Sequence, residues 1–183
     1  MTAEVAWRLF IEHGYDNVTV QDICAVADIA PRTFHRYFAS KDDVVSEPMR
    51  RMAAVVHEAI ASAPAAASDA ETMRHALLRL GQFVIDHAEL LTALRIVARQ
   101  SHQLRVTYLG VRPDQDGEIA ARLAARRPGD EATGWRLRLL VACSVAGFRI
   151  WYDDYFGLSP ADPLAHLERI LAAVERGTTY TAG

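Results

Sequence analysis

The stretch from residue 31 to residue 41 concentrates side chains that can form hydrogen bonds with a nucleic acid. A guanidinium can bind a guanine edge through two hydrogen bonds, and an ammonium can bind a phosphate. The stretch contains three cations and no acid, although residues 1–57 contain six Lys or Arg and eight Asp or Glu. The arrangement of charged residues within this stretch therefore favours contact with DNA, although the overall composition of the N-terminal region does not. The polar-tipped side chains of this stretch are Arg32, Thr33, His35, Arg36, Tyr37 and Lys41.

Two short helices joined by a tight turn are predicted to position these side chains. Thr19 with Asp22 three residues later resembles a capping box, which begins a helix that runs to about Ala27. Residues 28–30 form a short break, and Pro31 suits the first turn of the next helix. This is the geometry of a helix-turn-helix, in which the second helix enters the major groove of DNA.

Apolar residues recur at helical spacing along the whole chain, and no strand-like alternation interrupts them. We therefore expect an all-α fold of about nine helices, beginning with a three-helix domain that contains the helix-turn-helix. Phe34 and Phe38 lie four residues apart and should anchor the third helix to the core. The expected helices cover residues 3–13, 19–27, 31–38, 40–60, 70–87, 89–99, 103–126, 132–155 and 163–176.

Prolines and glycines predict the breaks between these helices. Gly14 follows the first helix, where a residue able to adopt positive φ is favoured. Pro48 lies inside the fourth helix and should kink it, and Pro113 should bend or split the helix over 103–126. We place a domain boundary at residues 43 and 44, with a helix over 44–62 linking the two parts.

Composition and charge exclude several classes of protein. The net charge of −3 over 183 residues argues against a non-specific coat for nucleic acid. No secretory signal and no apolar run of about 20 residues is present, so we expect a cytoplasmic protein without a membrane partner. Cys24 and Cys143 lie in apolar-periodic contexts, where two small core residues are favoured over a disulfide.

An enzymatic role finds little support in the sequence. Asp153 and Asp154 are adjacent, and adjacent residues on a helix point about 100° apart, so their carboxylates do not converge. The histidines lack the spacing of metal ligands, and no glycine-rich phosphate loop or nucleophile elbow is present. We therefore expect no catalytic residues, no metal and no cofactor.

The segment from Thr19 to Lys41 resembles the signature of the tetracycline-repressor (TetR/AcrR) family. In that family a Phe and a Gly-Tyr pair end helix one, and a Thr begins helix two. The resemblance covers about the first quarter of the chain, and the remainder agrees only in being helical and of suitable length. The matching residues are Phe10, Gly14-Tyr15, Thr19, Thr33-Phe34-His35-Arg36-Tyr37-Phe38 and Ser40-Lys41.

The resemblance implies which side chains meet DNA. Thr19 and Gln21 occupy positions that contact the backbone and bases from helix two, and Lys41 occupies a phosphate-contacting position. The sequence departs from the family pattern at three positions: Asp28 replaces the usual Gly of the turn, Ala30 the usual Ser, and His35 the usual Tyr. The complete set of candidate DNA contacts is Thr19, Gln21, Arg32, Thr33, His35, Arg36, Tyr37 and Lys41.

The resemblance also implies that residues 44–183 bind a small-molecule effector and form a homodimer. The protein would then be a ligand-relieved repressor that binds a palindromic operator in double-stranded DNA. The alternative is a dimeric helical adaptor that has lost DNA binding. Candidate ligand contacts are Phe83, His87, Leu91, Arg95, Tyr108 and Phe148. Candidate interface residues, which could instead pack within one subunit, are Leu137, Leu140, Val141, Ser144, Val145, Leu164, Leu167, Leu171 and Val174.

Overall fold

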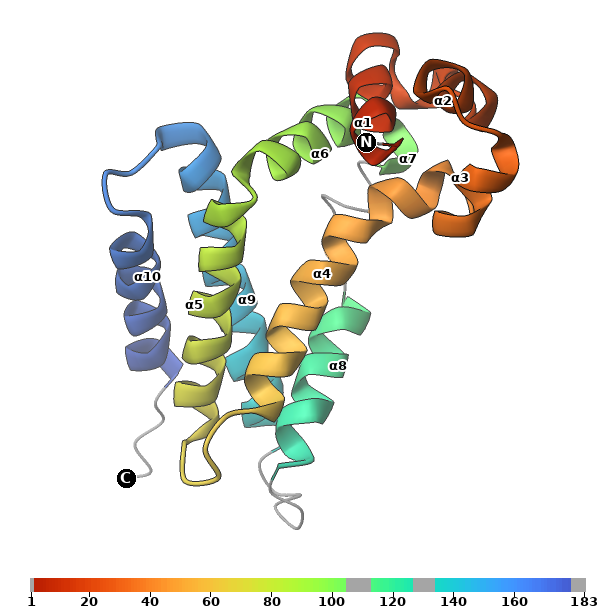
Figure 1. Ribbon diagram of the computed structural model, residues 1–183. Coiled ribbons are helices and arrows are strands. Elements are labelled where there is room, and N and C mark those ends of the chain that lie inside the picture. The colour runs from red at the N-terminus through yellow and green to blue at the C-terminus, as the bar shows by residue number, and fades with distance from the viewer. Residues whose placement is uncertain (1, 105–112, 127–133, 179–183) are drawn as a thin grey trace, which may run out of the picture. The chain divides into compact units, whose positions relative to one another are not determined.

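The computed structural model describes residues 2–104, 113–126 and 134–178 (Figure 1). Every regular element within these residues is a helix, which confirms the expected all-α fold. The chain forms two compact units, residues 1–51 with 87–111 and residues 52–86 with 112–183. The functional boundary at residues 43 and 44 stays a prediction.

The first unit packs short helices around an aromatic core. The rings of Phe10 and Tyr15 meet edge to face at a centroid distance of 5.2 Å. Phe10, Ile23 and Phe34 are fully buried, and each comes from a different helix. These large side chains fix the relative positions of the three N-terminal helices. The unit contains α1 (Thr2–His13), η1 (Tyr15–Asn17), α2 (Val20–Ala27), α3 (Pro31–Tyr37), the first half of α4 (Lys41–Ala61), α6 (Ala88–Gln100) and α7 (His102–Leu104).

The second unit is a bundle of long helices around α9. Figure 1 shows α5 and α10 lying beside α9, and α8 contacts α9 as well. Trp151 and Leu167 are fully buried, and the Trp151 indole N–H donates to the carbonyl of Pro163 at 2.7 Å. The unit contains the rest of α4, α5 (Asp69–Asp86), α8 (Pro113–Ala124), α9 (Gly134–Leu158) and α10 (Pro163–Thr178).

The predicted helix boundaries agree with the structure where a cap or a proline marks them. Pro113 is the first residue of α8, and the predicted break before it falls on residues 105–112, which lie outside the described part. A capping box missed in the sequence begins α5: the Glu71 carboxylate accepts from the Ser68 N–H at 2.7 Å. The kink predicted at Pro48 stays a prediction, because α4 continues as one helix through that residue.

Neither cysteine forms a disulfide. Cys24 is buried in the core of the first unit, as expected, whereas Cys143 on α9 is only half-buried. None of the helices in the described ranges is both long and apolar enough to span a bilayer.

Close packing in the second unit depends on a glycine. A Cβ atom built on Gly81 would lie 2.6 Å from Cδ2 of Leu167, whereas nothing lies within 4 Å of a Cβ at Gly117. Gly81→Ala is therefore expected to lower the free energy of unfolding by about 1 kcal/mol, because overpacking outweighs the gain in helix propensity. The matched control Gly117→Ala should raise that free energy by up to about 1 kcal/mol. Urea unfolding at one protein concentration measures both, and an equal gain in the two variants would contradict the packing argument.

Candidate nucleic-acid interface

A reciprocal capping box begins α2. The Asp22 N–H donates to the Thr19 hydroxyl oxygen at 3.2 Å, and the Asp22 carboxylate accepts from the Thr19 N–H at 2.8 Å. The Thr19 hydroxyl also donates to this carboxylate at 2.6 Å, and these hydrogen bonds from Thr19 lower the pKa of Asp22. The cap predicted from the sequence is confirmed, and it holds Thr19 and Gln21 at the exposed start of the helix.

The turn between α2 and α3 depends on a left-handed residue that is not glycine. Asp28 has φ 51° and ψ 49°, and its N–H and that of Ile29 both donate to the carbonyl of Cys24. Aspartate adopts this conformation more readily than most residues, so the turn tolerates the departure from the family pattern. Ala30 lies at the N-cap of α3 and forms no side-chain cap, because a methyl group cannot accept a hydrogen bond.

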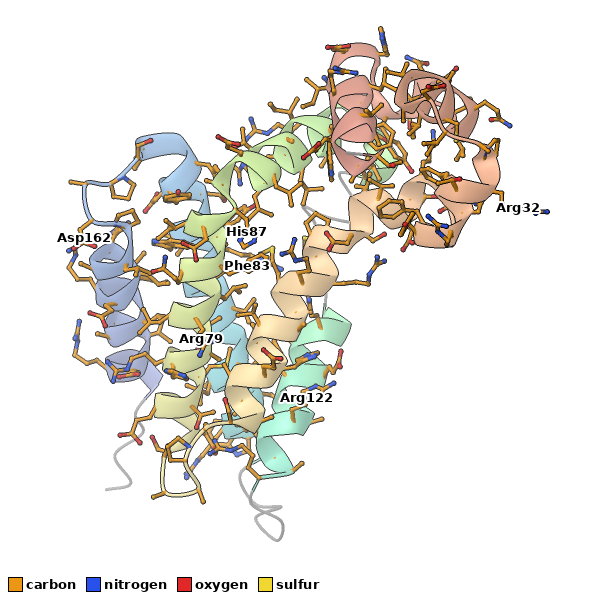
Figure 2. All side chains as sticks on the ribbon, in the orientation of Figure 1. Arg32, Arg79, Phe83, His87, Arg122 and Asp162 are labelled. Atoms are coloured by element: carbon orange, nitrogen blue, oxygen red, sulfur yellow. The ribbon has the colours of Figure 1, made fainter. Side chains whose placement is uncertain are left out.

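The short helix α3 is anchored by one face and exposed on the other. Phe34 is fully buried and lies 5.6 Å from the Phe38 ring, centroid to centroid. Figure 2 shows Arg32 extending away from the helix, and no hydrogen bond or ion pair joins it to another described residue. Of the remaining candidates on α3, Thr33 is half-buried and three are exposed: His35, Arg36 and Tyr37.

Two of the exposed side chains on α3 contact each other. An Arg36 N–H donates to the Tyr37 hydroxyl at 2.7 Å, and the guanidinium carbon lies 4.7 Å from the Tyr37 ring centroid. One N–H group of the Arg36 guanidinium is therefore bonded to the phenol. The other N–H groups of this exposed side chain still face solvent. The contact orients a cation at the C-terminal end of the helix.

Lys41, at the start of α4, has an internal role that the sequence did not reveal. Its ammonium donates to the carbonyls of Tyr15 at 2.8 Å and Val18 at 2.9 Å, and it lies 4.3 Å from the Tyr15 ring centroid. An ammonium has three donors, so the third can meet a phosphate. The phosphate contact of Lys41 stays a prediction, and the structure adds a role in holding η1.

The candidate ligand contacts are distributed over both units. Phe83, half-buried, and Phe148, buried, belong to the second unit. His87, Leu91 and Arg95 belong to the first unit. Leu91 is fully buried there, and the guanidinium of Arg51 lies 3.3 Å from Nε2 of His87. The remaining candidate, Tyr108, lies outside the described residues.

The candidate interface residues divide by burial within a single chain. Five are half-buried: Leu137, Leu140, Val145, Leu164 and Val174. Four are already buried without a second subunit: Val141, Ser144, Leu167 and Leu171. The burial of these four agrees with the alternative of packing within one subunit, since α9 contacts α5, α8 and α10 of its own chain. Other apolar side chains of α9 face solvent, among them Leu139 and Ile150.

Comparisons with known proteins agree with this helix-turn-helix geometry. Residues 3–47 match the family model described as "Bacterial regulatory proteins, tetR family". The chain is 30% identical over 158 residues to the HTH-type transcriptional regulator TcmR of Streptomyces glaucescens, covering 80% of this chain and 70% of that protein. It is 28% identical over 160 residues to the putative mycofactocin biosynthesis transcriptional regulator MftR of Mycobacterium tuberculosis, covering 83% and 78%.

A solved structure extends the likeness in fold to the whole chain. The TetR family transcriptional regulator PfmR from Thermus thermophilus is 17% identical, with a TM-score of 0.59 over 98% of this chain and 99% of that one. Fold and site together define a helix-turn-helix transcriptional regulator. The chain belongs to the TetR family, and it is a DNA-binding regulator and not an enzyme.

The pKa of Asp22 gives the cap of α2 a defined pH dependence. Because the pKa is lowered in the folded state, the carboxylate stabilises the fold above its unfolded pKa of about 3.9 and loses this effect as pH falls through the lower folded value. The difference in unfolding free energy between wild type and Asp22→Asn should therefore be constant from about pH 5 to 7 and shrink below about pH 4. In a Thr19→Ala background the same comparison should show a weaker pH dependence, because the hydroxyl no longer donates to the carboxylate. Urea unfolding at each pH tests this, and a difference that grows on acidification would contradict it.

Proposed function

We propose that this protein is a ligand-relieved repressor that binds a palindromic operator as a homodimer, with α3 as the recognition helix. The observation that carries the proposal is the exposed face of α3, which presents Arg32 and Arg36 without a neighbouring acid from residue 31 to 41. The N-terminal residues of a recognition helix reach base edges, which suits Arg32 for reading a guanine. Thr19 and Gln21 would contact the backbone and bases from the start of α2, and Lys41 would contact a phosphate.

The surface of α9 supports dimerisation. Leu139 is 45% exposed and Ile150 is 58% exposed, and the exposed Ala142 and Ala146 lie between them. Spacings of three and four residues place all four on one face of the helix, on the side away from the buried Val141. We infer that a second copy covers this face, with the half-buried candidates named above at its margin.

Two-fold symmetry then determines the form of the operator. Two identical recognition helices read two identical half-sites in opposite orientation, about 34–36 Å apart along the DNA. The small-molecule effector expected from the family would bind with different affinity to the DNA-competent and DNA-incompetent forms. Phe83 and Phe148 remain candidates for its contacts within the second unit. Because the operator is genomic DNA, we expect the protein to act in the cytoplasm.

The alternative is a dimeric adaptor that does not read DNA. Selection of duplexes from a random library by the wild-type protein separates the two functions. A regulator enriches one motif with two inverted half-sites, whereas an adaptor enriches none at low salt. A folded protein that enriches no sequence would overturn the proposed function.

Arg32→Ala is expected to weaken binding to the selected duplex by about tenfold to a hundredfold, because a bidentate arginine–guanine contact discriminates by about 1–3 kcal/mol. A repeated selection with the variant should lose its preference at one position in each half-site. The matched control is Arg79→Ala, which removes an exposed arginine from α5 of the second unit (Figure 2). Fluorescence anisotropy measures the affinities, and equal binding by the two variants would remove Arg32 from the interface.

Ile150→Glu is expected to convert the dimer to a monomer, because it places a charge in the middle of the proposed interface. The control is Ile96→Glu, which changes an isoleucine that is 39% exposed on α6 of the first unit. Sedimentation velocity should show a monomer for the first variant and a dimer for the second. A dimer in both would exclude this face of α9 as the interface.

A further inference from the structure

The turn η1 joins three parts of the first unit. It begins directly after Gly14, where φ is 82°, and it ends at Asn17, two residues before Thr19, the cap of α2. Its carbonyl at Tyr15, and that of the following Val18, accept hydrogen bonds from the Lys41 ammonium at the start of α4. The Tyr15 hydroxyl also donates to the carboxylate of Asp42. Hydrogen bonds from Lys41 and to Asp42 therefore connect the start of α4 to the residues just before the cap of α2.

Ser101 connects the same turn to α6. This serine follows the last residue of α6, is 1% exposed, and donates from its hydroxyl to the Asp16 carboxylate at 3.1 Å. The two residues are 85 positions apart in the sequence, and both belong to the first unit. Ser101 is the only buried serine in the described part of that unit. A hydrogen bond from a buried hydroxyl to a carboxylate oxygen at this distance is directional, so it ties the end of α6 to η1.

We propose that Ser101 is a positioning residue for DNA binding, which acts through Asp16 to hold η1 and, with it, the exposed start of α2. The inference rests on the proposed function, because it assigns how that same DNA-reading surface is held. Ser101 does not touch DNA in this scheme. Its hydroxyl fixes Asp16, Asp16 fixes the turn, and the turn determines where Thr19 and Gln21 lie relative to α3.

The effect of the Ser101–Asp16 hydrogen bond on DNA binding can be separated from an effect on the stability of the fold. Removing the Ser101 hydroxyl leaves no buried polar group behind, and the exposed Asp16 carboxylate can bind water instead. Ser101→Ala should therefore fold, while the turn loses its tie to α6. Sequence-specific binding needs every base contact in register, whereas non-specific binding needs only phosphates and tolerates a displaced helix.

The experiment compares the affinities of two duplexes of equal length, the one selected by the wild-type protein and a scrambled one, at a single salt concentration. Ser101→Ala should bind the selected duplex about tenfold more weakly and the scrambled duplex with a much smaller loss, because only the selected duplex offers base contacts to be lost. Ser101→Thr, which keeps the hydroxyl, should restore binding to the wild-type value. Ser62→Ala, which removes a hydroxyl that bonds only to nearby carbonyls in the second unit, is the matched control and should bind as wild type does.

Variants of Asp16 separate the hydrogen bond from the charge. Asp16→Asn and Asp16→Ala both remove an acid near the DNA, but only the amide can still accept from Ser101. Asp16→Ala should therefore bind the selected duplex more weakly than Asp16→Asn, and adding Ser101→Ala to it should weaken binding no further. Additive losses, equal losses on both duplexes, or wild-type affinity in Ser101→Ala would each overturn the inference. If the wild-type protein prefers no duplex, the proposed function itself fails; if it does and Ser101→Ala matches it, only this inference fails.

Discussion

The local structure of the N-terminal helices depends on the contacts of the Lys41 ammonium with η1 and the residue that follows it. The carbonyl of Tyr15 accepts a backbone hydrogen bond of 3.4 Å from the Val18 N–H, and the Lys41 ammonium donates to this carbonyl and to that of Val18. One cation provides both hydrogen bonds and lies over the ring of Tyr15, so it links the start of α4 directly to the entry to α2. The resemblance to the family predicts a phosphate contact for this lysine, and the structure adds an architectural role.

Local chemistry made much of the N-terminal region predictable from the sequence. The cap at Thr19, the break at Asp28 and the proline that begins α3 each act within four residues, and each lies where it was expected. Phe34 was likewise correctly predicted to be buried, because burying a large aromatic side chain on the apolar face of a short helix is strongly favourable. Caps, turn residues and apolar faces of this kind can be recognised in a single sequence, because each depends on residues close together in the chain.

Contacts between distant segments were not predictable in the same way. Nothing in the sequence pairs Ser101 with Asp16, since a serine after a helix usually bonds to its own backbone. The apolar stripe of α10 illustrates a second limit. Leu167 and Leu171 have the spacing of an interface, yet they fill the bundle of their own chain, while Leu139 and Ile150 on α9 face solvent. Periodicity shows that a face needs a partner and does not show which helix supplies it.

The acids around α3 have a consequence for how the protein finds its target. Asp22 and Asp28 lie on the helix and turn that precede Arg32 and Arg36, and the whole chain carries a net charge of −3. Like charges repel the phosphates of any duplex, so the cations gain little until base contacts add to them. Binding to random DNA, which rests on phosphate contacts alone, is then expected to be weak, and discrimination between the operator and other duplexes to depend on the base contacts of α3.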